Sequence, residues 1–245
     1  MGESGPGYQL CLSPHYAWVQ RVFSIVPGAR GYLRKEKLRE VDILIRRYAA
    51  ERIDEAVREL EAARSSLSSR ASQAFFASTP MLGGSPLLGG ADAASVRGFQ
   101  LLGETLRSLS IELQNVGSDL LYADSGWAPI GAAQAVREDE IRQLCEYDDA
   151  VIGVAEALAS RARELRLLVE AGRVEEAANK AMELRELLAS LRETYEERRK
   201  YLRFVTHEGL SAREAMKRLG AGAASALSRA KGLLARLAGR LGLGK

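Results

Sequence analysis

Histidine, cysteine and aromatic side chains are scarce in this chain of 245 residues, which has two histidines, two cysteines and 6% aromatic residues. Neither His15 nor His207 follows a glutamate by three residues, as a histidine ligand of a di-iron carboxylate bundle does. Cys11 and Cys145 lack the close spacing of zinc ligands, and the glycine-rich stretch at 83–90 is not followed by the Lys-Ser/Thr of a phosphate-binding loop. We therefore expect no enzymatic activity, no metal or other cofactor and no small-molecule substrate.

Long apolar runs and a secretory signal are also missing. No stretch of 18 consecutive apolar residues occurs, so the sequence predicts no transmembrane helix. Residues 1–7 lack the basic start and the apolar core of a secretory signal. The two distant cysteines fit a reducing compartment, although a single bridge between them stays open. We expect a cytoplasmic location, with association at the periphery of a membrane as an open alternative.

Proline is rare, with six residues, whereas Ala, Leu, Glu and Arg dominate, as is typical of long helices and coiled coils. Alternating three- and four-residue steps between apolar positions recur along most of the chain. The sequence predicts an all-α fold: an elongated antiparallel bundle of four long helices with coiled-coil-like seams, a short N-terminal helix and a C-terminal amphipathic helix. We divide the chain into an N-terminal cap segment (1–30), a helical bundle (31–207) and a basic amphipathic tail (208–245).

Residues 141–205 form the centre of this prediction, an antiparallel helical hairpin. Gly172 separates the two arms and suits the left-handed residue that closes a helix. The apolar positions of the first arm are Ile141, Leu144, Val151, Ala155, Leu158, Ala162, Leu165 and Val169. Those of the second arm are Val174, Ala177, Ala181, Leu184, Leu188, Leu191, Tyr195, Leu202 and Val205.

Two further long helices are predicted before the hairpin. Apolar positions spaced by three and four residues run through 31–77. The next helix starts after Asp92, a good N-cap residue, and continues to Leu120. Most charged residues of 31–77, Arg46 among them, are assigned to solvated outer faces.

An apolar loop joins these two helices. Residues 71–91 carry no charge, and the near-repeat at 80–91 contains two prolines and four glycines, which exclude a regular helix. We expect a flexible loop over 78–91 that presents four apolar side chains, Met81, Leu82, Leu87 and Leu88. These side chains either cover the end of the bundle or contact a protein partner or a membrane.

Two positions of the hairpin seam are charged instead of apolar. Asp148 lies 24 residues before Gly172 and Arg198 lies 26 residues after it. An antiparallel hairpin brings these positions level, so we expect Asp148 and Arg198 to approach each other. Such a pair would fix the register of the helices at some cost in stability, with a functional polar pocket as the alternative interpretation.

The tail has a distinct charge. From Ala215 to Lys245 there are seven basic and no acidic residues, whereas the first 214 residues carry 28 basic and 32 acidic ones. Ser211 and Glu214 form a capping-box pattern, which predicts a helix from about residue 212. Its internal glycines each cost about 1 kcal/mol relative to alanine, which favours a detachable tail that becomes ordered only against a surface. The residues expected to bind an anionic surface are Arg218, Arg229, Lys231, Leu234, Arg236, Leu237, Arg240 and Leu241.

These features favour a non-enzymatic scaffold or assembly protein whose rod sets a distance and whose tail binds an anionic surface. A membrane is the preferred surface, because a leucine face beside an arginine ridge is typical of interfacial helices. One alternative is an RNA- or ribosome-associated factor whose arginines contact phosphates. Another is an oligomeric structural bundle in which the tail packs as an extra core helix. Self-association, or a protein partner bound through the helical seams, is compatible with all three.

Overall fold

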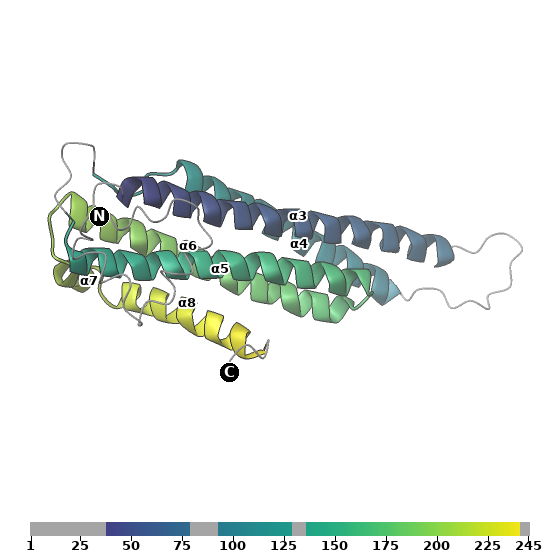
Figure 1. The fold of residues 1–245 in the computed structure, drawn as a ribbon. Helices are drawn as coiled ribbons and strands as arrows, with labels where there is room; N and C mark the ends of the chain where they lie inside the picture. The colour runs from purple at the N-terminus through teal and green to yellow at the C-terminus, as the bar shows by residue number, and fades with distance from the viewer. Residues whose placement is uncertain (1–37, 79–92, 129–135, 241–245) are drawn as a thin grey trace, which may run out of the picture.

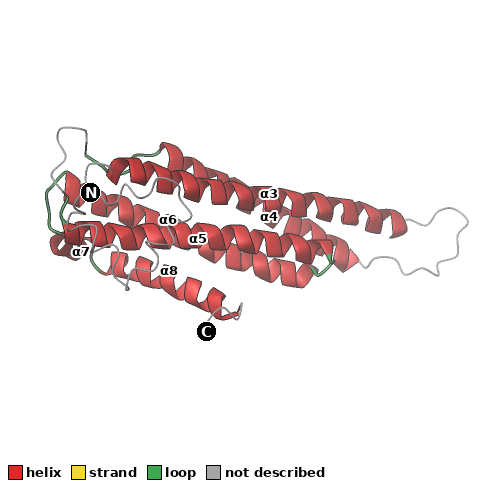
Figure 2. Cartoon of the chain, in the orientation of Figure 1, coloured by secondary structure: helices red, strands yellow, loops and turns green. Residues whose placement is uncertain are grey.

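The computed structural model describes residues 38–78, 93–128 and 136–240. These residues form the helices α3 (Leu38–Ser78), α4 (Ala93–Tyr122), α5 (Glu138–Glu170), α6 (Val174–Thr206), α7 (Ala212–Leu219) and α8 (Ala221–Arg240), as Figures 1 and 2 show. No strand occurs within these three ranges. The prediction of an all-α fold is confirmed.

The four longest helices lie side by side in an elongated shape, and we call α3–α6 the helical body (Figure 1). Helix α3 packs on α4 and α5, and α6 packs on α5 and α4. Arg163 of α5 pairs with Glu55 of α3 at 2.5 Å, and Arg166 pairs with Glu59 at 2.6 Å. The paired residue numbers rise together, so α3 and α5 run in the same direction.

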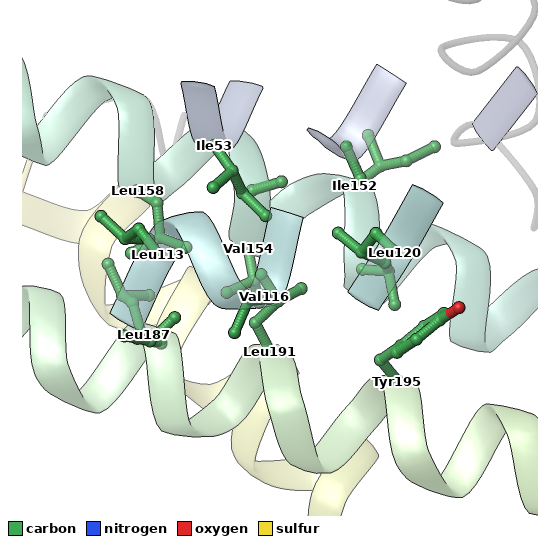
Figure 3. Close-up of a cluster of buried hydrophobic side chains, with 14 of the residues drawn as sticks. Ile53, Leu113, Val116, Leu120, Ile152, Val154, Leu158, Leu187, Leu191 and Tyr195 are labelled. Atoms are coloured by element: carbon green, nitrogen blue, oxygen red, sulfur yellow. The ribbon is translucent and has the colours of Figure 1, made fainter. Parts of the chain in front are cut away.

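The core of the body is built from the seams that the three-four spacing predicts. Every predicted seam position of the hairpin is buried except Val174, which is half-buried. Figure 3 shows how the long helices share this core, with Ile53, Leu113, Leu158 and Leu187 coming from α3, α4, α5 and α6 in turn. Burial of such side chains from water stabilises the body by roughly 2 kcal/mol each.

The turn between α5 and α6 has the geometry expected from its glycine. Gly172 has a φ of +78°, a backbone conformation that glycine adopts without steric cost. The Gly172 N–H donates to the carbonyl of Val169 at 3.0 Å, and the Arg173 N–H donates to that of Leu168 at 2.9 Å. This pair of bonds is a Schellman motif, which satisfies carbonyls that the helix end would leave without partners.

The tail differs from its prediction in two respects. The capping box forms, with the Ser211 hydroxyl accepting from the Glu214 N–H at 3.3 Å, but the helix ends at Leu219 instead of running on. Gly220, with a φ of +69°, separates the short α7 from α8. Second, α8 is ordered against α5 and α6, where Ala230 is fully buried, as in the alternative of an extra core helix; that the tail detaches stays a prediction. Periodicity at 100° per residue missed the break, because it does not register a single left-handed residue.

Several sequence predictions concern residues that the structure does not describe. The N-terminal cap segment (1–30), the apolar-loop residues Met81, Leu82, Leu87 and Leu88, and the tail residue Leu241 all lie outside the described ranges.

Candidate functional site

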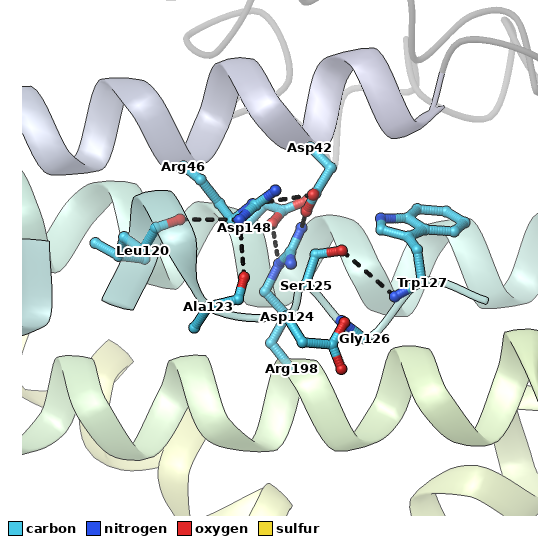
Figure 4. A network of polar contacts seen from close by, with 10 residues as sticks. All are labelled: Asp42, Arg46, Leu120, Ala123, Asp124, Ser125, Gly126, Trp127, Asp148 and Arg198. Atoms are coloured by element: carbon cyan, nitrogen blue, oxygen red, sulfur yellow. Dashed lines mark hydrogen bonds and ion pairs between the residues drawn. The ribbon is translucent and has the colours of Figure 1, made fainter. Parts of the chain in front are cut away.

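The two charged seam residues of the hairpin meet inside the body. Nε of Arg198 lies 2.5 Å from Oδ1 of Asp148, the contact that the register of the hairpin predicts. Asp42 of α3 completes the arrangement, because Nη2 of Arg198 lies 2.5 Å from its Oδ1 (Figure 4). All three side chains are at most 2% exposed. Asp42 could not be predicted from the sequence, since nothing in its local pattern distinguishes it from a surface aspartate.

Arg46 extends this network to α4. Its Nε donates to Oδ2 of Asp42 at 3.0 Å, one helical turn away, and its Nη1 donates to the Leu120 carbonyl at 2.9 Å (Figure 4). Arg46 is only 12% exposed, so its assignment to a solvated outer face is wrong. We call Asp42, Arg46, Asp148 and Arg198 the buried ion network.

The buried ion network is suited to fixing structure rather than to binding a solute. It contains two carboxylates and two guanidinium groups, so its formal charges cancel. Asp42, Asp148 and Arg198 are enclosed by three helices, and a solute reaches their charged atoms only if the body opens. The network therefore aligns α3, α5 and α6 at one position along their length.

The segment after α4 is tied to the same end of the body. The Gly126 N–H donates to Oδ1 of Asp124 at 3.0 Å, and the Ala128 N–H donates to the Thr206 hydroxyl at 3.0 Å. The hydrogen bond from Arg203, together with that from Gly126, holds the pKa of Asp124 below its ordinary value. Trp127 packs against the core, with the Arg39 guanidinium 5.8 Å from its ring centre.

The leucine face of α8 is turned toward the body. Leu227, Ala230 and Leu233 are buried there, and Leu234 and Leu237 are half-buried against the core. In this arrangement Leu234 and Leu237, predicted to enter a membrane, pack against the core of the body instead. The physical reason is that these two helices offer apolar surface within reach of the chain, which the sequence pattern alone cannot show.

Basic residues of α8 meet carboxylates of the body. Arg229 pairs with Glu193 of α6, and Nζ of Lys231 lies 2.9 Å from Glu146 of α5. Arg236 is exposed and lines a surface hollow of about 210 Å³ together with Glu183 and Glu186. The acidic side of α5 and α6 thus complements the basic tail. Arg240 ends α8, and its side chain is not described.

Arg218 does not belong to the arginine ridge of α8. It lies in α7, where it pairs with Glu208 and stacks 5.0 Å from the ring centre of Phe204. Because Gly220 breaks the helix, Arg218 shares no helical face with Arg229. The predicted set of anionic-surface residues is therefore divided between two helices.

Two buried tyrosines hold α7 and the start of α5 in place. The Tyr147 hydroxyl contacts the sulfur of Met216 at 3.7 Å, and the Tyr201 hydroxyl donates to the Glu140 carbonyl at 3.1 Å. Their ring centres are 5.8 Å apart. Burial raises the pKa of both phenols, and the negative charges of nearby glutamates add to this effect. Both hydroxyls therefore stay protonated near neutral pH.

The described ranges show no group of three or more His, Cys, Asp and Glu side chains that could hold a metal ion. None of the helices in this part of the chain combines the length and the apolar content that crossing a bilayer requires. Comparison of the chain with protein-family models, curated proteins and solved structures found no match.

Proposed function

We propose that this chain is a non-enzymatic scaffold protein in which the antiparallel hairpins α3–α4 and α5–α6 form an elongated four-helix bundle and α8 binds an anionic membrane surface. The observation that carries the proposal is the character of α8: it has an apolar face, basic residues and no acidic residue. A membrane with anionic lipids offers this helix hydrocarbon for its leucines and phosphate for its arginines.

Apolar contacts and ion pairs, the two kinds of contact that an anionic membrane also offers, keep α8 on the body. Lys231 and Arg229 are both 53% exposed, and exposed ion pairs contribute about 0–1 kcal/mol each. The fully buried apolar set, centred on Ala230, is small. An anionic membrane therefore competes with the body for both faces of α8.

Release of α8 needs a pivot, and Gly220 supplies one. A Cβ atom at Gly220 would meet no atom within 4 Å, so the chain is uncrowded at this point. Helix α7 stays anchored meanwhile, because Ala215 is fully buried and Met216 contacts Tyr147. In the proposed function, α8 swings about Gly220 from the body to the membrane.

A second candidate is a scaffold in which α8 remains a permanent extra core helix. The complete burial of Ala230 and the 6% exposure of Leu227 favour it. The two candidates differ in whether a membrane can remove α8 from the body.

Liposome flotation of the full chain tests the proposal, with anionic and neutral vesicles at low and moderate salt. Binding to anionic vesicles is expected, and Leu234→Asp with Leu237→Asp should abolish it even though the arginines stay. Arg229→Glu with Arg236→Glu should also weaken it, more strongly at low salt, where the attraction between the helix and anionic lipid is least screened. The matched control is Arg64→Glu with Arg107→Glu on α3 and α4, which reverses two exposed arginines away from α8 and should leave flotation unchanged.

Circular dichroism verifies that each variant is folded. Absence of flotation in the unmodified chain would contradict the membrane proposal and favour the permanent helix. Tight, strongly salt-dependent binding to single-stranded RNA without flotation would instead support the nucleic-acid alternative.

A further inference from the structure

The surface under α8 is complementary to that helix in both shape and charge. On α5 and α6 it offers the carboxylates of Glu146 and Glu193 to Lys231 and Arg229. Between these pairs, Leu227 and Leu233 are buried against the body. We call this surface of α5 and α6 the α8-binding face. It is formed chiefly by two helices that precede α8 in the chain, so the face is complete whichever copy of α8 fills it.

We propose that the α8-binding face also accepts α8 from a second copy of this chain, so that two copies exchange their C-terminal helices. The exchange would form the same apolar contacts and the same ion pairs as the docked helix does. Swapping an identical element is a low-cost route to a dimer, because only the hinge and the entropy of association differ. The inference concerns contacts between copies and does not depend on membrane binding.

Gly220, directly before α8, is a suitable pivot for the exchange. Gly220 has a φ of +69° and open space around it. On its N-terminal side, α7 is fixed to the body through Ala215, Met216 and the contact of Arg218 with Phe204. The turn from α7 to α8 thus depends on one residue, and a different backbone conformation at Gly220 would send α8 away from its own body.

The direction of α8 determines the shape of the dimer. Helix α6 runs toward α7, and α8 then runs back along the body from that end (Figure 1). Once α8 leaves its own body, its 20 residues can reach up to about 30 Å from Gly220, beyond the α7 end. A second copy related by a two-fold axis at the α7 end would receive this helix on its own α8-binding face. The exchanged dimer is therefore joined end to end and is nearly twice as long as the monomer.

Charge reversal provides the test, using full-length chains without lipid. A tail-reversed chain carries Arg229→Glu and Lys231→Glu, and a body-reversed chain carries Glu146→Lys and Glu193→Lys. In each variant alone, α8 and the α8-binding face carry like charges, so α8 is repelled both within one copy and between identical copies. In a mixture, each α8 finds a complementary face only on the other chain. A chain with all four substitutions restores both pairs within one copy and is the matched control.

Size-exclusion chromatography with light scattering should detect one-to-one dimers in the mixture. We expect about tenfold or more dimer in the mixture than in either variant alone at the same concentration, and little in the control. Small-angle X-ray scattering should show that the maximum dimension of the dimer is close to twice that of the monomer. Addition of 1 M salt should reduce the difference, because it screens exposed pairs.

A mixture that stays monomeric, with both variants folded by circular dichroism, would overturn the proposal. A compact, side-by-side dimer would overturn it as well, since exchange at Gly220 requires an extended one. If a double reversal does not fold, Lys231→Glu mixed with Glu146→Lys repeats the test with one pair, and the same outcomes decide it.

Discussion

Arg198 divides its guanidinium between two aspartates from different helices, Asp42 and Asp148, at 2.5 Å each. Removing three charges from water carries a large desolvation penalty, which their mutual attraction offsets only when the geometry is good. The value of the arrangement is therefore best measured by comparing a network with one charge removed and a network whose remaining charges balance.

Arg198→Met should destabilise the protein by about 3–5 kcal/mol, because it removes the guanidinium that both buried carboxylates contact and leaves an excess of negative charge in the core. Urea denaturation followed by circular dichroism measures this loss. Adding Asp148→Asn to Arg198→Met should recover much of it, since Asp42 and Arg46 then remain as a balanced pair. Arg192→Met is the matched control, because Arg192 is 45% exposed and pairs with Glu112 at 3.3 Å; its effect should stay below about 1 kcal/mol. Equal effects of Arg198→Met and Arg192→Met would contradict this account.

Two glycines, one in a turn and one inside a helix, should have opposite effects on stability when alanine replaces them. Gly126 follows α4 with a φ of +86°, and a Cβ atom there would lie 2.5 Å from the Arg199 carbonyl oxygen. Gly103 lies inside α4, and a Cβ atom there would meet no atom within 4 Å. The same substitution should therefore have opposite signs at the two positions.

Gly126→Ala should lower the free energy of unfolding by about 2 kcal/mol or more, from left-handed strain and the clash with Arg199. Gly103→Ala should raise it by about 0.5–1 kcal/mol, because alanine loses less entropy in a helix. Thermal denaturation of the two single variants and the unmodified chain measures both changes in stability. A loss of stability at both positions would show that α4 does not tolerate a methyl group at residue 103.

The same elements show how far the sequence could predict the structure. The α5–α6 hairpin, its left-handed Gly172 and the capping box of Ser211 depend on patterns within a few residues, and these were found. The contact of Arg198 with Asp148 followed from the register of adjacent helices. Asp42 was missed because it lies 156 residues from Arg198, and no local pattern reports such a distance. The docking of α8 could be given only as one alternative for a similar reason, since it depends on the exposed surface of α5 and α6.

For the whole molecule, buried phenols predict sensitivity to alkali. Burial raises the pKa of Tyr147, Tyr195 and Tyr201 in the folded chain above the ordinary value of 10.0. Nearby charges act on them too, chiefly Glu197 and Glu146 on Tyr147. As pH rises through about 10, the unfolded chain loses protons that the folded chain retains, so stability falls with rising pH by up to about 1.4 kcal/mol per pH unit for each tyrosine.

Urea denaturation at several pH values between about 8 and 11 measures this slope. Tyr147→Phe should make the slope shallower, because the substitution removes one titrating group and keeps the ring. Tyr122→Phe is the matched control, since Tyr122 is 84% exposed, and it should leave the slope unchanged. The explanation fails if the two variants show the same slope as the unmodified chain.

The buried ion network also bears on the order in which the body can assemble. The α5–α6 hairpin closes a short segment of chain, and it contains a carboxylate and a guanidinium, Asp148 and Arg198. Helix α3, distant in sequence, contains another such pair in Asp42 and Arg46, one turn apart. The charged residues that α3 and the α5–α6 hairpin each contribute to the network therefore cancel before the two parts meet. When α3 docks on a preformed hairpin, the Asp42–Arg46 pair meets the Asp148–Arg198 pair, and Arg198 gains Asp42 as a second partner. Both pairs are neutral, so no net charge has to be carried into the core during folding.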